Sequence, residues 1–170
     1  MIAQNQANTI LKRAFFNVCK YDEYLLRTNA NERSVTHRFA VYIEQELANL
    51  DLDQRIDVDC EYNRYYEEPK RLLSFKRKLD SDDASGVIAY PDIIVHIRGT
   101  EANLIVIEVK LVGAARKCTL ASDCSCDRCK LRAYKEDLKY EHAFFVTFPT
   151  GDGSAKLALL SIESLIERIS

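Results

Sequence analysis

Apolar residues recur at helical spacing between about residues 31 and 50 and predict the clearest helix of the chain. These apolar positions form one stripe, which indicates a helix with one buried face. The members of the stripe are Val35, Phe39, Tyr42, Ile43, Leu47 and Leu50. Shorter helices are expected within the first 25 residues, over 127–140 and over 162–169.

Other apolar runs predict the strands of a sheet. An alternating run covers residues 54–62, and two strongly apolar runs, about 87–98 and 103–111, are joined by a short connection that contains glycine, as in a β-hairpin. A fourth strand is expected at 143–148 and a short edge strand at 157–160. The order of helix, three strands, helix and strand predicts a small α/β fold with a mixed central sheet.

The chain has the size of one domain, covering residues 1–170. Because 47% of its residues are hydrophobic, it can bury one substantial core. The polar and charged stretch 63–86 predicts a long hairpin excursion or loop. The N-terminus has no basic region followed by an apolar core, and no apolar stretch is long enough to span a bilayer, so we expect a cytoplasmic protein.

The formal net charge of −2 provides no general attraction to nucleic acid, so any such binding must come from local basic patches. Two stretches are candidates: residues 64–78, which include Lys70, and residues 128–135. Each stretch also fits a solvated charged face that has no ligand. The candidate nucleic-acid contacts within them are Arg64, Lys76, Arg77, Lys130 and Arg132.

Carboxylates stand at the ends of two successive apolar runs. Asp92, which follows a proline, opens the first run, and Glu108 and Lys110 close the second. Side chains alternate along a strand, so Glu108 and Lys110 share a face with Val106. A charge on that face is costly unless it is paired or binds a metal. The alternative is a surface pair between Glu108 and Lys110, with Asp92 capping a turn.

Two neighbouring carboxylates suit a hard divalent cation such as Mg²⁺, which prefers oxygen ligands and keeps several waters. The candidate ligands are Asp92, Glu108 and the backbone carbonyl of Val109, with a substrate phosphate completing the coordination shell. Such a cation can activate water beside a phosphodiester. Lys110 would then orient the attacking water or offset the charge that builds on the phosphate.

A further carboxylate projects onto the apolar side of the helix at 31–50. At about 100° per residue, Glu32 lies on the same side as Phe39 and is therefore a candidate fourth site residue. An acid in the first turn also stabilises a helix through its macrodipole, which is the alternative reason for Glu32. Glu46, at the other end of the helix, is the second choice, whereas Glu44 projects away.

Three short motifs follow one another along the chain: Asn31-Glu32-Arg33-Ser34-Val35, Pro91-Asp92 and Glu108-Val109-Lys110. With the predicted order of elements, they resemble the PD-(D/E)XK nuclease superfamily, which has a restriction-endonuclease-like fold. Glu32 before an apolar helix resembles the first-helix glutamate of Holliday-junction resolvases and phage-type exonucleases. The segments around Cys60 and Asp92 also resemble a family of small uncharacterised bacterial and phage proteins of this fold. The resemblance covers about residues 30–148.

This resemblance implies that Asp92 and Glu108 hold the metal and that Lys110 is the catalytic lysine. Glu32 would be the additional acid of the first helix. Many members of the superfamily cut DNA with magnesium, some cut RNA and some have lost activity. We therefore expect a nuclease that depends on Mg²⁺ or Mn²⁺ and acts on DNA in preference to RNA. Members also often use a polar residue on the helix after the third strand, for which the candidates are Lys130, Arg132 and Tyr134.

Four of the six cysteines lie close together after the third strand, in a cysteine-rich insertion at about 116–130. Such a cluster can bind zinc and fix a loop that has no core of its own, and free thiols are the alternative. Iron–sulfur clusters of the superfamily flank the nuclease core, so that cofactor is not carried over. Cys19 and Cys60 have apolar neighbours and are expected to be packing residues. The cluster consists of Cys118, Cys124, Cys126 and Cys129.

Other chemistries have less support from the sequence. Neither His37 nor His96 has a cysteine or aspartate at the spacing of a nucleophile and base, so we expect no hydrolase triad. Two other functions stay open. One is a catalytically silent module of the same fold that binds nucleic acid or protein through a zinc-stiffened loop. The other is a regulatory subunit with a redox-sensitive cysteine loop. A homodimer fits the sequence as well as a monomer.

Overall fold

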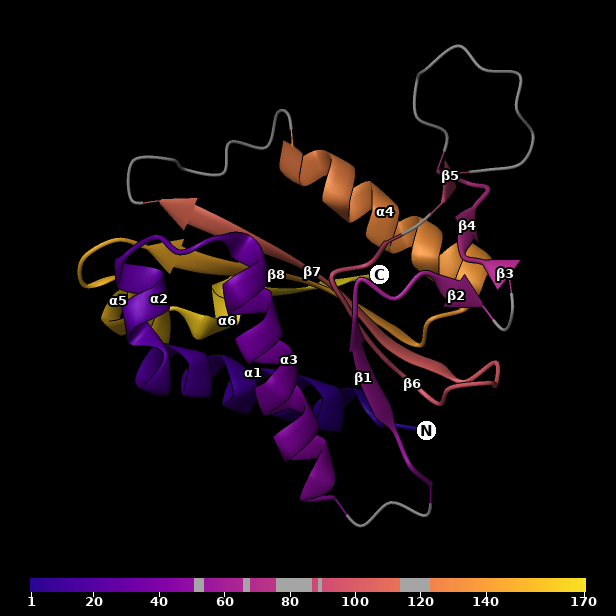
Figure 1. The fold of residues 1–170 in the computed structure, drawn as a ribbon, viewed down its shortest axis with the longest axis horizontal. Coiled ribbons are helices and arrows are strands. Elements are labelled where there is room, and N and C mark those ends of the chain that lie inside the picture. The colour runs from indigo at the N-terminus through magenta and orange to yellow at the C-terminus, as the bar shows by residue number, and fades with distance from the viewer. Residues whose placement is uncertain (51–53, 66–67, 76–86, 89, 114–122) are drawn as a thin grey trace.

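The computed structural model is an α/β fold built on a mixed five-stranded sheet with helices on both faces (Figure 1). None of the helices in the described parts of the chain is both long enough and apolar enough to cross a membrane. The structure describes residues 1–50, 54–65, 68–75, 87–88, 90–113 and 123–170.

The five strands of the sheet lie in the order β1-β6-β7-β8-β9. Strands β1, β6 and β7 pair antiparallel, β8 is parallel to β7, and β9 is antiparallel to β8. Helix α4 (Asp123–Leu138) lies between β7 and β8 in sequence, because a parallel pair needs a long crossover connection. The strand bounds are β1 Asp57–Cys60, β6 Ile93–His96, β7 Asn103–Gly113, β8 His142–Thr150 and β9 Ile166–Ile169.

Helices α1 (Gln4–Tyr21) and α3 (Glu32–Ala48) cover one face of the sheet, and α4 covers the other (Figure 1). Strand β7 contributes to both cores, because alternate side chains point to opposite faces. Ile105 and Ile107 are buried in the core with α1 and α3, whereas Val106 is buried in the core with α4. The face that was predicted to carry Val106 and Glu108 is therefore the face under α4.

The helix predicted at 31–50 and the strands predicted at 103–111 and 143–148 are confirmed. The helix predicted at 127–140 is also present, but it begins at Asp123, inside the segment that was expected to be an insertion. The first helix is longer than expected: α1 has 18 residues and buries one continuous apolar side. Its length follows from the apolar spacing, which continues through most of the segment.

The strand predicted at 87–98 is wrong in its extent. Pro91 has no N–H group to donate to a ladder, and β6 begins only at Ile93. The preceding pair of residues, β5 (Val87–Ile88), belongs to a separate two-stranded sheet with β4 (Arg71–Leu72). Strand β1 is likewise shorter than its predicted range of 54–62.

The two predictions at the C-terminal end are also corrected. The edge strand predicted at 157–160 is part of helix α5 (Ser154–Leu160), since its alanine and leucine residues favour a helix. The helix predicted at 162–169 ends after one turn, α6 (Ile162–Leu165). The remaining residues form β9, which pairs with the exposed edge of β8.

The predicted excursion at 63–86 carries short strands in the part that the structure describes, and Lys70 lies among them as one of the most buried residues, at 1% exposed. Its ammonium donates to the Tyr140 hydroxyl at 2.6 Å and lies 5.1 Å from the centre of the Tyr62 ring. Lys70 therefore fastens the excursion to the connection between α4 and β8 and is not part of a basic surface. The short elements not yet named are α2 Glu23–Arg27, β2 Arg64–Tyr65 and β3 Glu68–Pro69.

Replacing Lys70 with methionine should change how stability depends on pH. Burial lowers the pKa of Lys70 to about 8, so between pH 8 and its ordinary pKa of 10.5 the folded state binds fewer protons than the unfolded state. The free energy of unfolding of the wild type, relative to Lys70→Met, should therefore rise with pH through this window, by up to about 3 kcal/mol. Urea denaturation at several pH values measures this difference.

Lys156→Met, at an exposed position, is the matched control and should show no such trend. A difference between wild type and Lys70→Met that stays constant from pH 7 to about pH 10 would contradict the burial of a charged Lys70.

Candidate active site

The pairing of β6 with β7 sets Asp92 opposite Glu108. Ile93 pairs with Ile107 and Ile94 pairs with Val106, and the same antiparallel register continued by one residue brings the two acids together. Side chains at such opposing positions have Cβ atoms roughly 5 Å apart. Asp92 is fixed there because its Oδ2 accepts the backbone N–H of Val109 at 2.7 Å.

Glu108 is only 4% exposed, and its environment leaves it incompletely satisfied. It has a hydrogen bond with the Tyr134 hydroxyl, and the Lys130 ammonium lies 4.0 Å from its Oε2. Its Oε1 is buried and finds no hydrogen-bond partner among the described residues. Burial, and then the charge of Asp92, raises the pKa of Glu108 well above its usual value. Such an atom is what a bound cation or proton would satisfy.

The pKa of Asp92 is also raised, to about 6. Burial is the main cause, opposed by the hydrogen bond from the Val109 N–H, and the nearby charge of Glu32 adds to the rise. Two acids with raised pKa values at one place indicate a site where negative charge is concentrated and poorly solvated.

Glu32 reaches the same strand from the first turn of α3. The side chain of Asn31 caps this helix by accepting the Ser34 N–H at 2.8 Å. Glu32 Oε2 accepts the N–H of Leu111 at 3.1 Å, and its Oε1 lies 3.9 Å from the Lys110 ammonium. Lys110 therefore pairs with Glu32, and the expected alternative of a surface pair between Glu108 and Lys110 is wrong.

The second-choice acid on α3 lies elsewhere. Glu46 is at the opposite end of the helix from Glu32 and lies 3.5 Å from the Arg13 guanidinium on α1. Glu44 is exposed, as predicted. Of the three acids considered on this helix, only Glu32 is in contact with β7 within the described contacts.

Helix α4 brings a further acid that the sequence analysis missed. Asp127 accepts a hydrogen bond from Lys130 at 3.0 Å, and its charge contributes to the raised pKa values of Asp92 and Glu108. The signal for it was the spacing of residues 127, 130 and 134, which share one helix face. Among the three predicted candidates on this helix, Lys130 and Tyr134 approach Glu108, whereas Arg132 is exposed.

A cleft of about 440 Å³ opens beside Asp92, between α3 and the end of β1. Across it, the Arg33 guanidinium lies 2.9 Å from the Glu61 carboxylate. Glu61 has a left-handed backbone (φ 50°), and its N–H donates to the Asp92 carbonyl at 3.2 Å. The cleft is lined by Glu32, Arg33, Thr36, His37, Cys60, Glu61 and Asp92.

Cys19 and Cys60 differ in their surroundings. Cys19 is buried in the core with α1 and α3, as predicted. Cys60 is exposed at the cleft and is not a packing residue, which corrects that prediction. Cys60 is the last residue of β1, where the cleft separates the strand end from α3.

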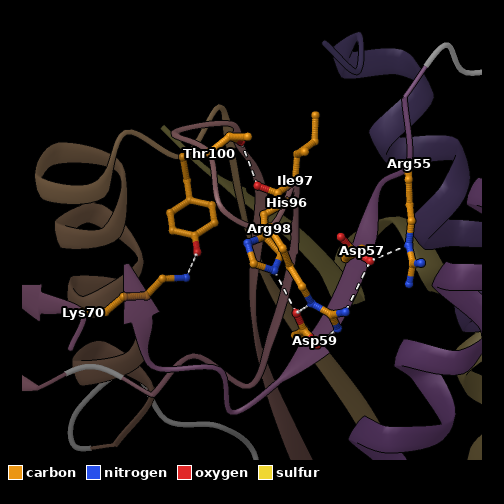
Figure 2. A network of polar contacts seen from close by, with 9 residues as sticks. Arg55, Asp57, Asp59, Lys70, His96, Ile97, Arg98 and Thr100 are labelled. Carbon is orange, nitrogen blue, oxygen red and sulfur yellow. Dashed lines mark hydrogen bonds and ion pairs between the residues drawn. The ribbon is translucent and has the colours of Figure 1, made fainter. Parts of the chain in front are cut away.

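A second polar network lies at the other end of β6 (Figure 2). No aspartate stands near His96 at the sequence spacing of a nucleophile and base, but in the fold its Nε2 lies 2.8 Å from Asp59 Oδ2. Arg98 also binds the Asp59 carboxylate, with Nε at 2.9 Å from Oδ2. Burial lowers the pKa of His96, which favours its neutral form. The pairing of β1 with β6 creates this contact, which joins the two strands through their side chains.

Several predicted residues cannot be placed in the site. Cys118, Lys76 and Arg77 lie outside the described residues, and Cys124 and Cys126 are known only as part of α4. The zinc site that would include them with Cys129 stays a prediction. Arg64 is exposed, as Arg132 is, and both stay candidate nucleic-acid contacts.

In the described parts of the chain there is no group of three or more His, Cys, Asp or Glu side chains that could hold a metal ion. A cation between Asp92 and Glu108 would therefore have two carboxylates and complete its shell with water and substrate oxygens. That is the usual arrangement for Mg²⁺, which binds through one or two carboxylates and keeps several waters. The described contact of Val109 is made by its N–H, and a role for its carbonyl stays a prediction.

Comparison of the chain with models of protein families, with curated proteins and with solved structures finds no match.

Asp92→Asn should raise the free energy of unfolding of the metal-free protein at about pH 7.5, by roughly 3 kcal/mol. Because the pKa of Asp92 is raised to about 6, the folded state binds more protons there than the unfolded state between about pH 4 and 6. The wild type thus loses stability as pH rises through this window, and the neutral amide does not.

Chemical denaturation with a chelator present, at about pH 4 and pH 7.5, measures this effect. The exposed Asp152→Asn serves as the matched control and should leave stability unchanged at both pH values. If Asp92→Asn is no more stable than the wild type at about pH 7.5, ionisation of Asp92 does not destabilise the folded state.

Proposed function

We propose that this protein is a divalent-metal-dependent nuclease with a restriction-endonuclease-like core of the PD-(D/E)XK type, acting on DNA in preference to RNA. The observation that carries the proposal is the facing pair of Asp92 and Glu108, largely buried, with one carboxylate oxygen of Glu108 unpartnered among the described residues. Lys110 lies two residues further along the same strand. A purely structural acid pair would be expected to have its oxygens satisfied.

The order of elements supports the same proposal. Helix α3, the antiparallel strands β1, β6 and β7, the crossover helix α4 and the parallel strand β8 follow one another in the order that the resemblance implies. The three motifs fall on the first turn of α3, before β6 and within β7. Fold alone does not establish activity, so the acid pair and Lys110 remain the main argument.

Asp92 and Glu108 would hold Mg²⁺ or Mn²⁺. A bound cation of this kind lowers the pKa of a water ligand and offsets charge on a phosphodiester. The two acids can accommodate a metal ion. Glu108 Oε1 has no hydrogen-bond partner among the described residues, and only one of the two Asp92 oxygens accepts the Val109 N–H. Both carboxylates must be ionised to bind it, and their raised pKa values make binding weaken as pH falls below about 6.

The other site residues position these groups. The Tyr134 hydroxyl contacts Glu108 and restricts its orientation, and the Lys130 ammonium partly offsets the charge of the acid pair. Glu32 is fixed by the Leu111 N–H and holds the Lys110 ammonium beside the cleft. From there Lys110 can orient an attacking water or bind a phosphate oxygen, which is the role that we assign to it.

Lys110→Ala and Glu108→Gln should each lower the rate of DNA cleavage by about 100-fold or more. Lys110→Ala removes the ammonium group that contacts water or phosphate, and Glu108→Gln removes a carboxylate ligand of the metal. The assay uses linear, circular, single-stranded and branched DNA with magnesium, manganese or chelator. Lys156→Ala, at an exposed position on α5, is the control for the loss of a positive charge.

Cleavage by pure Lys110→Ala at the wild-type rate would contradict the proposal. Absence of metal-dependent cleavage on every substrate by a folded wild type would contradict it as well. That second result would favour the catalytically silent binding module.

Glu32→Gln should lower cleavage by about tenfold and raise the magnesium concentration needed for half-maximal rate. The amide oxygen can still accept the Leu111 N–H, but the charge that holds Lys110 and adds to the negative potential at Asp92 is lost. Glu44→Gln removes an equivalent charge from the exposed side of the same helix and should have no effect. If Glu32→Gln and Glu44→Gln change the cleavage rate equally, Glu32 has no role in the site beyond stabilising the helix through its macrodipole.

A further inference from the structure

Helix α1 has a charge distribution unlike that of the whole chain. Its 18 residues include three basic side chains and no acidic one, although the chain carries a net charge of −2. Arg13, Phe16 and Lys20 recur at spacings of three and four residues, so they lie along one side of the helix. All three are exposed, on the side opposite the buried core residues.

Aromatic rings alternate with the basic residues along this side and onto α2. Phe16 is 43% exposed, Tyr21 64% and Tyr24 67%. Cations lie over these rings: the Lys20 ammonium is 4.9 Å from the centre of the Tyr21 ring, and the Arg27 guanidinium is 5.3 Å from that of Tyr24. We call the set Arg13, Phe16, Lys20, Tyr21, Tyr24 and Arg27 the α1 ridge.

The α1 ridge is connected to the cleft by side chains of α3. The Tyr21 and Tyr42 rings are 6.4 Å apart, and Arg38 lies over Tyr42 at 4.9 Å. Arg38 is adjacent in sequence to His37, which lines the cleft beside Asp92. Helix α3 therefore carries both the Tyr42 contact to the α1 ridge and residues that line the cleft, with Arg38 paired to the Asp22 carboxylate between them.

We propose that the α1 ridge binds single-stranded nucleic acid and guides it to the cleft, an inference that rests on the proposed nuclease function. Exposed aromatic rings can stack on unpaired bases of any sequence, while lysine and arginine contact the phosphates between them. A duplex keeps its base faces stacked on one another and offers only its phosphates. Helix α1 carries no carboxylate that would repel a polyanion, and the one acid within α2 is the exposed Glu23.

Binding is measured by fluorescence anisotropy with labelled oligothymidylate, oligouridylate and a DNA duplex of equal length, all about 20 nucleotides. The protein carries Lys110→Ala and the buffer contains chelator, so that the result does not depend on cleavage. Both single strands should bind more tightly than the duplex. Phe16→Ala and Tyr24→Ala should each weaken single-strand binding by about tenfold. Leu157→Ala, at an apolar position that is 64% exposed on α5, is the matched control and should have no effect.

A second readout separates phosphate contacts from stacking. The double variant Lys20→Gln with Arg27→Gln should reduce the slope of log affinity against log salt by about 1.4. Thermal unfolding of each variant checks that it is folded. Duplex binding as tight as single-strand binding, or affinities unchanged in the ring variants, would overturn the inference. Absence of cleavage by the wild type together with intact single-strand binding would instead contradict only the proposed activity. Comparison of the two single strands shows whether the DNA or the RNA strand is preferred.

Discussion

The candidate site depends on one constraint, the antiparallel register of β6 and β7, which holds Asp92 opposite Glu108. Two carboxylates this close repel each other, and burial increases the cost of charging either. The Val109 N–H, the Tyr134 hydroxyl and the Lys130 ammonium offset only part of that cost, since the pKa values of both acids stay raised. We propose that a bound cation offsets the rest of that cost.

The surrounding elements are arranged about this pair. Helix α3 approaches from one face of the sheet and α4 from the other, so Glu32 and Lys130 reach the same region of β7 from opposite sides. The Asp59–His96 contact joins β1 to the far end of β6. The Glu61 N–H joins the end of β1 to Asp92. The short strand β6 is thus held at both ends, which fixes the acid that precedes it.

The spacing of apolar residues was sufficient to predict the helix at 31–50. It also predicted which side chains of β7 lie on each face of the sheet, because both features depend on local spacing. The neighbouring acids were predicted from the position of Asp92 and Glu108 at the ends of two apolar runs that a short hairpin joins. Contacts between distant segments could not be predicted in this way. The Asp59–His96 pair depends on strand register, and Lys70 resembled part of a basic surface because Tyr140, which accepts its hydrogen bond, is 70 residues away. The short apolar run at 157–160 was ambiguous between strand and helix, and its leucine and alanine residues form a helix with the three residues before them.

The most direct test of the acid pair is Mn²⁺ binding, measured by electron paramagnetic resonance on the protein alone. At about pH 7.5 the wild type should bind Mn²⁺, and binding should weaken as pH falls through about 6, where Asp92 becomes protonated. Glu108→Gln should lose this binding while remaining folded. Mn²⁺ binding that is the same in wild type and Glu108→Gln, or no binding by the wild type at millimolar Mn²⁺, would contradict the assignment of Asp92 and Glu108 as a cation site.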